Sequence, residues 1–275
     1  MKKVRIALIQ MKVCRDTAVN LRTAETMIRQ AAERADIVVL PEMFCCLYTN
    51  KAFVAAKEPK GGRIWSVLQK AAAEKHVYLV GGSMPEEEDG RIYNTCFVFD
   101  REGKQIARHR KVHLFDIDIE GGQHFRESDT FTPGDSYTVF DTEFGKMGVE
   151  ICFDIRFQEL ARITALAGAK VIFIPAAFNM TTGPAHWELH FRGRAVDNQV
   201  FVCGCAPARD ENGPYISYGN SIAVSPWGDV TGRLDEKEGI LYQEPDLDQV
   251  NSIRGQLPIM KNRRTDLYEV KWKQK

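Results

Sequence analysis

The sequence predicts one α/β domain in which two layers of strands form the core and helices cover them. Apolar strand segments alternate with amphipathic helical segments along the chain, which is typical of such folds. No linker, repeat or low-complexity segment divides the 275 residues, so we expect a single domain over residues 1–275. Hydrophobic residues make up 44% and charged residues 27% of the chain, which is enough apolar material for a large core.

Strand and helix signals alternate from the start of the chain. Residues 4–9 form an apolar strand, and residues 17–34 carry apolar side chains at spacings of three and four, which predicts an amphipathic helix. Residues 35–40 are continuously apolar and stop at Pro41, as in a strand covered on both faces. The Glu-rich run 86–90 is predicted to be a solvated turn. The other elements predicted in this half are a helix over 61–75 and strands over 76–82, 94–100 and 105–114.

The alternation resumes after a long loop. Residues 115–133 show little periodicity, and a loop of this length inside a compact domain is usually functional. Strand signals at 147–151 lead into Cys152, and an amphipathic segment follows. The polar tail beyond Pro258 is predicted to pack on a partner subunit. The remaining predicted elements are strands over 137–140, 171–174, 200–205 and 240–243, a hairpin over 219–229, and helices over 160–167, 186–198 and 247–256.

Charge and cysteine content argue against several classes of protein. Lys plus Arg (37) equals Asp plus Glu (37), so no basic excess points to nucleic acid or to an anionic membrane surface. The N-terminal apolar run is interrupted by Arg5 and ends at Gln10, which is too short for a signal peptide or a membrane span. Seven cysteines at irregular spacings fit a reducing compartment, and we expect a cytoplasmic protein. No glycine-rich phosphate-binding loop is present, and we expect no cofactor.

Three side chains of complementary chemistry each follow a predicted strand. They are Glu42, Lys111 and Cys152. If the strands run in compatible directions, the three meet at one sheet edge, which is where ligands bind in open α/β folds. A thiol needs a base, and the oxyanion that forms when it attacks a carbonyl needs a cation or N–H donors. The alternative for Cys152 is a small buried hydrophobic residue.

The segments that contain these residues carry a resemblance to a known family. Residues 40–44 (LPEMF), 110–116 (RKVHLFD) and 149–160 (VEICFDIRFQEL) resemble the three motif blocks of the nitrilase (carbon–nitrogen hydrolase) superfamily, in the order of that family. The resemblance implies a four-layer αββα sandwich and a homodimer or higher homo-oligomer. The likeness continues through residues 125–128, 132–135, 178–188, 194–199 and 226–228.

The resemblance also implies a role for each matching residue. Glu42 would be the general base that takes the Cys152 proton and later delivers a proton to the departing ammonia. Lys111 and the backbone N–H of Phe153 would stabilise the oxyanion, and Glu127 would position Lys111 and the substrate amide. The lysine would also favour the Cys152 thiolate. The first product is an acyl-thioester, from which water releases the acid.

The residues after the nucleophile indicate a branch of the superfamily. Nitrilases proper carry Trp-Glu there, whereas this chain has Phe153-Asp154, which favours an amidase. Residues 113–119, 178–188 and 225–228 are most similar to omega-amidases, which hydrolyse the terminal amide of 2-oxoglutaramate and 2-oxosuccinamate. The alternatives are an N-carbamoyl amine hydrolase or another aliphatic amidase, and a non-catalytic scaffold of the same fold.

Omega-amide substrates carry a carboxylate at the far end, and their pocket needs a fixed cation. Arg156 is the candidate, with the Thr182 hydroxyl assisting. The alternative for Arg156 is a structural ion pair with Glu159 or a neighbour. Side chains predicted to line the pocket are Phe44, Tyr48 and Phe178.

Two further patterns resemble metal sites only superficially. His186 and His190 lie one helical turn apart, but Glu188 lies roughly 200° around the helix from His186, unlike the glutamate of a zinc-protease helix. We expect His186 at the pocket edge or in packing, and His190 in a structural role. Cys203 and Cys205 alternate along a strand with no further ligand at metal spacing, so we expect both in the core.

Overall fold

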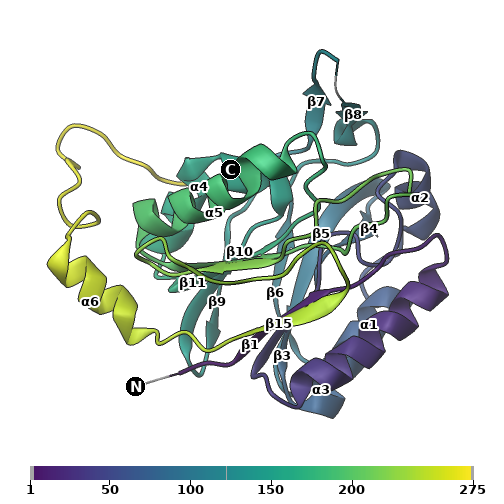
Figure 1. Cartoon of the computed structure of the whole chain (residues 1–275), viewed down its shortest axis with the longest axis horizontal. Helices are drawn as coiled ribbons and strands as arrows, with labels where there is room; N and C mark the ends of the chain where they lie inside the picture. Colours follow the sequence, from purple (N-terminus) through teal and green to yellow (C-terminus); the bar gives the residue numbers. More distant parts are fainter. Residues whose placement is uncertain (1–2, 122, 274–275) are drawn as a thin grey trace.

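The computed structural model describes residues 3–121 and 123–273, and it arranges them around two β-sheets packed face to face. Helices cover the outer face of each sheet, so the layers run helix, sheet, sheet, helix (Figure 1). This is the four-layer αββα order implied by the resemblance. It buries the apolar faces of both sheets and of the helices that cover them.

The first sheet has seven strands in the order β15-β1-β2-β3-β5-β4, with β6 pairing β5 beside this path. β1, β2 and β3 are parallel to one another, and the other pairings are antiparallel. Helices α1 (Thr17–Ala32) and α3 (Arg63–Lys75) cover its outer face. The strands are β1 (Ile6–Gln10), β2 (Ile37–Val39), β3 (Tyr78–Val80), β4 (Met84–Glu88), β5 (Arg91–Phe99), β6 (Gln105–Arg110) and β15 (Gly239–Gln243).

Strand β1 shows why a strand in this position is apolar throughout. All five of its residues are buried. Ile6 and Leu8 pack with residues of the second sheet, whereas Ala7 and Ile9 pack with residues of α1 and α3. Because successive side chains of a strand point to opposite faces, a strand covered on both sides needs no polar alternation.

The second sheet has six strands in the order β14-β13-β12-β11-β10-β9, of which β10, β11 and β12 are parallel. Helices α4 (Gln158–Leu166) and α5 (Gly183–Asn198) cover its outer face (Figure 1). The strands are β9 (Thr138–Thr142), β10 (Gly145–Val149), β11 (Val171–Pro175), β12 (Phe201–Cys205), β13 (Ile222–Val224) and β14 (Val230–Arg233).

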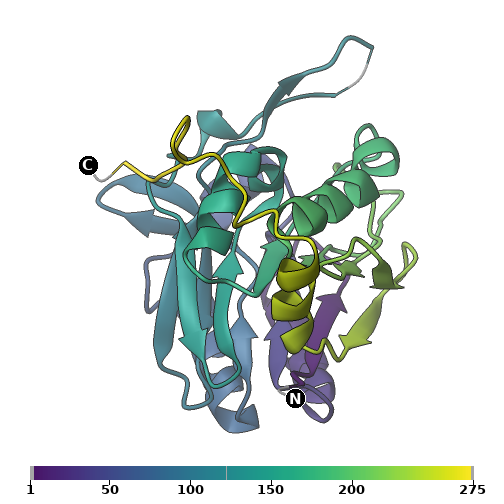
Figure 2. The same cartoon turned by 90° about the vertical axis from the view of Figure 1, so that its left-hand side faces the viewer.

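Several elements lie outside the two sheets and their covering helices. Within the predicted long loop, β7 (Asp116–Asp118) and β8 (His124–Arg126) pair as a hairpin that projects from the body of the molecule, as Figures 1 and 2 show. The 3-10 turn η1 (Glu127–Asp129) follows it, and helix α2 (Asn50–Ala56) was not predicted.

Helix α6 (Asp248–Gln256) leads into a C-terminal tail that runs past α4 (Figure 2). The tail contacts its own chain: Trp272 lies 5.9 Å from the ring of Tyr137 and donates a hydrogen bond of 3.1 Å to the carbonyl of Asp135. Trp272 therefore lies against the surface of its own chain.

Of the Glu-rich run 86–90, only Asp89 and Gly90 form the exposed turn that was predicted. The three glutamates before them belong to strand β4, and Glu86 is completely buried. Two arginines of β6 reach Glu86 across β5: Arg108 Nη1 lies 3.0 Å and Arg110 Nε 2.8 Å from its carboxylate oxygens. Thr95 donates a third hydrogen bond of 2.8 Å. Long-range charge pairing therefore permits burial of a residue that the local pattern assigned to solvent.

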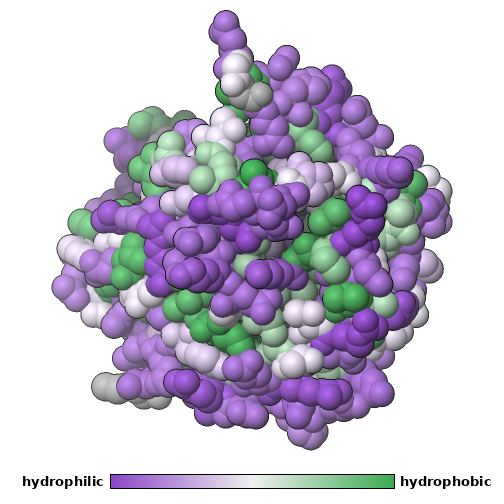
Figure 3. Space-filling view, turned by 45° about the vertical axis from the view of Figure 1, so that its right-hand side comes forward, coloured by the Kyte–Doolittle hydropathy of each residue, from purple (hydrophilic) through white to green (hydrophobic). Residues whose placement is uncertain are grey.

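In the part of the chain that the structure describes, no helix is both long enough and apolar enough to cross a membrane. The face seen in Figure 3 is mostly hydrophilic, with small separate apolar areas.

Candidate active site

The ends of three strands bring Glu42, Lys111 and Cys152 together. Glu42 follows β2, Lys111 follows β6 and Cys152 follows β10. The Lys111 backbone continues the β5–β6 ladder by donating to the carbonyl of Asn94 at 2.8 Å. The Glu42 carboxylate interacts with the Cys152 thiol through a hydrogen bond and with Lys111 through an ion pair. All three side chains are buried, so their charges act on one another with little screening by water.

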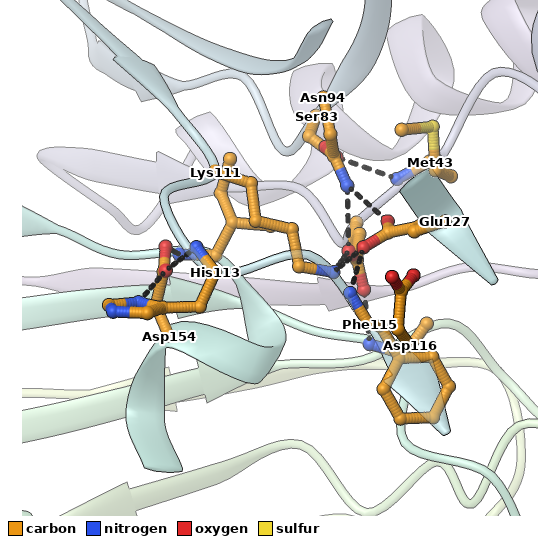
Figure 4. Close-up of polar contacts among 12 residues, drawn as sticks. Met43, Ser83, Asn94, Lys111, His113, Phe115, Asp116, Glu127 and Asp154 are labelled. Carbon is orange, nitrogen blue, oxygen red and sulfur yellow. Dashed lines mark hydrogen bonds and ion pairs between the residues drawn. The ribbon is translucent and has the colours of Figure 1, made fainter. Parts of the chain in front are cut away.

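Lys111 lies between two carboxylates. Its Nζ atom is 2.8 Å from Glu42 Oε1 and 2.9 Å from Glu127 Oε2. Glu127 is itself fixed, because its Oε2 accepts a hydrogen bond of 2.7 Å from the backbone N–H of Phe115. Figure 4 shows Lys111 and Glu127 pointing toward each other, with Asn94 beside them. The loop after β8 thus brings Glu127 to the same cation as Glu42.

Asn94 and Tyr48 bridge the two carboxylates, and sequence reasoning missed Asn94. The Asn94 side-chain amide donates to Glu42 Oε1 at 2.9 Å and to Glu127 Oε1 at 3.1 Å. Tyr48 Oη lies 3.0 Å from Glu127 Oε1 and 3.3 Å from Glu42 Oε1. The signal available in the sequence was an amide near the start of strand β5, whose residues 93–99 are all buried.

Burial controls the protonation of this cluster. Burial, together with the charge of Glu127, raises the pKa of Glu42 against the opposing effect of Lys111. Despite its burial, Lys111 has a raised pKa, because Glu127 and Glu42 stabilise its charge. Burial and the neighbouring Glu42 raise the pKa of Cys152 well above its ordinary value, and Lys111 offsets this only in part. Lys111 thus favours the thiolate, as expected, but burial and Glu42 outweigh it, and Cys152 is a thiol at neutral pH.

The backbone at Cys152 is in the left-handed region, with φ +47°. This conformation is strained for a non-glycine residue and has to be held by its surroundings. Cys152 begins the 3-10 turn η2 (Cys152–Arg156), and α4 starts only at Gln158, so the predicted helical segment is split.

Asp154 holds this turn in place. Its Oδ2 accepts a hydrogen bond of 3.0 Å from the backbone N–H of Ile151. Its Oδ1 lies 2.9 Å from the backbone nitrogen and 2.8 Å from Nδ1 of His113, a contact drawn in Figure 4. His109 Nε2 adds a contact of 3.0 Å. Although burial opposes ionisation, the two histidines lower the pKa of Asp154, so it is a carboxylate that joins the Cys152 turn to the Lys111 segment.

Arg156, at the end of η2, has no acidic partner among the described residues. The structure therefore shows no ion pair with Glu159. Its guanidinium lies over the rings of Phe178 and Phe153, with Cζ 5.0 Å and 5.5 Å from the ring centres. It also interacts electrostatically with Cys152. A half-buried cation beside the candidate nucleophile is thus available to a ligand anion.

The other predicted pocket residues lie in different surroundings. Thr182 donates its hydroxyl to Asn179 Oδ1 at 3.0 Å and is almost completely buried. Tyr48 lines a small cavity together with Glu42, Ala177 and Tyr215. Phe44 is fully buried in the core between the first sheet and its helices and is not among the residues that line this cavity. Tyr215, which the sequence analysis did not identify, stacks against Tyr48 at 4.6 Å and donates a hydrogen bond to the Ala177 carbonyl.

The two metal-like patterns have other partners. His186 and His190 both contact Arg156. Cys203 and Cys205 are buried in the core, and the Cys205 thiol donates to the backbone carbonyls of Ile9 and Val39. Gly204 between them allows α5 to approach, because a Cβ there would lie 2.3 Å from the Phe191 ring.

Comparison with known proteins identifies the family. A family model described as carbon-nitrogen hydrolase matches residues 5–255. The chain belongs to the carbon–nitrogen hydrolase family. Omega-amidase NIT2 of Danio rerio is 48% identical over 271 residues, which cover 98% of each chain. The Homo sapiens omega-amidase NIT2 is 46% identical over 274 residues, or 99% of each chain.

Solved structures of this family have the same fold. Saccharomyces cerevisiae Nit3, a member of branch 10 of the nitrilase superfamily, is 40% identical and superposes with a TM-score of 0.88. The match covers 95% of this chain and 97% of Nit3. A carbon–nitrogen hydrolase of Helicobacter pylori is 26% identical, with a TM-score of 0.84 and 97% of each chain covered.

Proposed function

We propose that this carbon–nitrogen hydrolase is an omega-amidase, which hydrolyses the terminal amide of 2-oxoglutaramate and 2-oxosuccinamate to the acid and ammonia. One observation carries the proposal: Arg156, a cation without an acidic partner among the described residues, lies beside the cluster of Glu42, Lys111 and Cys152. Identities of 46% and 48% to omega-amidases over nearly the whole chain support it.

In the first half-reaction, Cys152 Sγ attacks the amide carbonyl carbon while its proton passes to Glu42. Because the thiol is protonated at rest, the base has to act during the attack, and the Glu42 carboxylate that hydrogen-bonds the thiol is placed for this. The raised pKa of Glu42 makes it a better proton acceptor. Lys111 and the backbone N–H of Phe153 stabilise the oxyanion.

Collapse of the tetrahedral intermediate breaks the carbon–nitrogen bond. Glu42 returns its proton to the nitrogen, ammonia leaves, and a thioester on Cys152 remains. In the second half-reaction Glu42 deprotonates a water molecule, which attacks the thioester; the carbon–sulfur bond breaks, Glu42 returns the proton to Cys152 Sγ, and the acid leaves. In both half-reactions Glu127 positions Lys111 through the 2.9 Å ion pair. Asn94 fixes the two carboxylates relative to each other by donating a hydrogen bond to each.

The substrate carboxylate binds Arg156. Phe178 and Phe153 flank the guanidinium and reduce its contact with water, which strengthens a charge-assisted hydrogen bond. Thr182, at the start of α5, would assist by exchanging the hydrogen bond that its hydroxyl donates to Asn179 for one to the carboxylate. Tyr48 lines the site next to the two glutamates. Loss of the charged contact in Arg156→Ala should cost about 2 kcal/mol or more of transition-state binding.

Ammonia release from a panel of amides tests the proposal. The panel contains 2-oxoglutaramate, 2-oxosuccinamate, glutamine, an N-carbamoyl amine and a simple nitrile, each assayed with the wild type and with Cys152→Ala. We expect release from the oxo-acid amides, abolished in Cys152→Ala. Turnover of the carbamoyl compound alone would be consistent with the catalytic roles of Glu42, Lys111 and Cys152 but would contradict the assignment of Arg156 as the carboxylate site. No ammonia release from any compound would contradict the proposed activity.

We further propose that residues 1–275 act as one domain in a cytoplasmic homodimer. The outer faces of α4 and α5 expose Leu166, Leu189 and Val196, whose relative accessibilities are 41%, 67% and 38%. A second copy placed against these helices would cover this apolar surface and extend the layers into the partner. Sedimentation velocity measures the mass directly, and a monomer at micromolar concentration would contradict the dimer.

A further inference from the structure

Two histidines, rather than an acid, hold the Arg156 guanidinium. Its Nη1 atom lies 3.2 Å from His186 Nδ1 and 3.0 Å from His190 Nε2. The two rings come from successive turns of α5, with centres 5.9 Å apart and planes at 75°. Both imidazoles therefore converge on a single nitrogen of the arginine.

These contacts use only one edge of the guanidinium. Nη1 carries two hydrogens and donates one to each ring. Within residues 3–121 and 123–273, neither Nε nor Nη2 has a hydrogen-bond partner, and Nε is buried. Nε and Nη2 present two parallel N–H groups, which is the geometry that binds a carboxylate with two hydrogen bonds.

The histidines have to be neutral to play this part, because a ring nitrogen accepts a hydrogen bond only when it carries no proton. Burial, followed by the positive charges of Arg156 and Arg194, lowers the pKa of His190 to about 4, and His186 acts in the same direction. Arg156 also interacts electrostatically with Cys152 and Tyr215, which are both uncharged at neutral pH because burial raises their pKa values.

Neutral acceptors have an advantage over an acid at this position. An aspartate or glutamate would orient Arg156 equally well, but it would neutralise the guanidinium and compete with a ligand anion for it. Two imidazoles fix the orientation and leave the full positive charge in place. The histidines accept only the hydrogens of Nη1, and no group among the described residues accepts a hydrogen bond from Nε or Nη2.

We propose that His186 and His190 are positioning residues for substrate specificity, which as neutral acceptors hold Nη1 of Arg156 so that its Nε and Nη2 edge binds the substrate carboxylate. The inference rests on the proposed function, since it requires a substrate with a carboxylate at the end opposite the amide. Neither ring touches the reacting atoms; both act through Arg156.

Two substrates and two variants test this role. The substrates are 2-oxoglutaramate and pentanamide, a neutral amide of the same chain length, and the readout is the ratio of their kcat/KM values. His190→Leu removes an acceptor, and His190→Gln keeps a neutral side-chain oxygen at this position. We expect the ratio to fall about tenfold in His190→Leu, through a higher KM for 2-oxoglutaramate, and to recover most of this loss in His190→Gln.

The outcomes that would overturn the inference are distinct from failure of the proposed function. An unchanged ratio in His190→Leu, or an equal loss for both substrates, would show that His190 only supports the fold. The variant Arg156→Ala separates failure of the histidine role from failure of the proposed function. If it lowers the ratio while His190→Leu does not, the histidine role alone is wrong; if it leaves the ratio unchanged, the carboxylate site of the proposed function is wrong as well.

Discussion

Replacing Lys111 with methionine leaves two buried carboxylates without their shared cation. Methionine has nearly the length of lysine, so the change removes the charge and its contacts of 2.8 Å to Glu42 and 2.9 Å to Glu127 with little change in volume. Removing one partner of a buried ion pair costs about 3–5 kcal/mol of unfolding free energy. Because Lys111 pairs with two carboxylates, we expect Lys111→Met to lower the unfolding free energy at pH 8 by an amount in the upper part of that range.

The loss should depend on pH with a definite sign. Burial already raises the pKa of Glu42, and without Lys111 this pKa rises further. The native state of Lys111→Met then holds a proton that the unfolded chain has released, so its stability falls as pH rises from about 6 to 8. One such proton gives a slope of up to about 1.4 kcal/mol per pH unit.

Urea unfolding at fixed protein concentration, followed by tryptophan fluorescence at pH 6 and pH 8, measures both quantities. The exposed Lys104→Met is the matched control and should change the unfolding free energy by less than about 0.5 kcal/mol. The double variant Lys111→Met/Glu127→Gln removes one of the two carboxylates and should regain stability at pH 8 while staying inactive. A loss below about 1 kcal/mol in Lys111→Met, or no recovery in the double variant, would refute this electrostatic reasoning.

Two further predictions concern charged groups near the nucleophile. Asp154→Asn weakens the contacts that hold the strained Cys152 turn, and we expect a loss of about 2–3 kcal/mol at pH 7 with strongly reduced activity. The pKa of Asp154 is lower in the folded than in the unfolded protein. The carboxylate therefore contributes its full stabilisation above the unfolded-state pKa and loses it as pH falls through the folded-state pKa. The unfolding free energy of Asp154→Asn should accordingly decrease less with falling pH than that of the wild type. For His190, whose pKa is lowered to about 4, the unfolded chain binds the proton more readily, and wild-type stability should fall as pH drops from about 6.5 toward 4. His190→Gln should remove this part of the slope in the same urea measurements, and an identical slope would contradict a buried neutral His190.

Local patterns predicted the strand ends and therefore the central cluster. The apolar runs before Glu42 and Cys152 reflect strands covered on both faces, a property that the chain has to encode locally. The alternation of strands and helices likewise predicted the layers around the two sheets. Resemblance to the nitrilase superfamily then pointed to Glu127, whose link to Lys111 no spacing rule would indicate.

The features that the sequence did not predict share a physical cause, which is pairing between residues distant in the sequence. Glu86 looked like part of a solvated turn because Arg108 and Arg110, which neutralise it, lie two strands away. The state of the Cys152 thiol depends on burial and on how the Lys111 charge is already shared, and neither can be seen in a linear pattern. His190 gains its contact only because η2 ends beside α5.

Intact-protein mass spectrometry of an acid-quenched reaction with 2-oxoglutaramate tests most directly whether Cys152 carries an omega-amide through a thioester. We predict an adduct with the mass of the acyl group in the wild type, absent in Cys152→Ala. In Arg156→Ala the adduct should appear only at substrate concentrations more than about tenfold higher. Ammonia release by the wild type without an adduct in either rapid-quench or steady-state samples, or an adduct that persists in Cys152→Ala, would contradict the proposed chemistry.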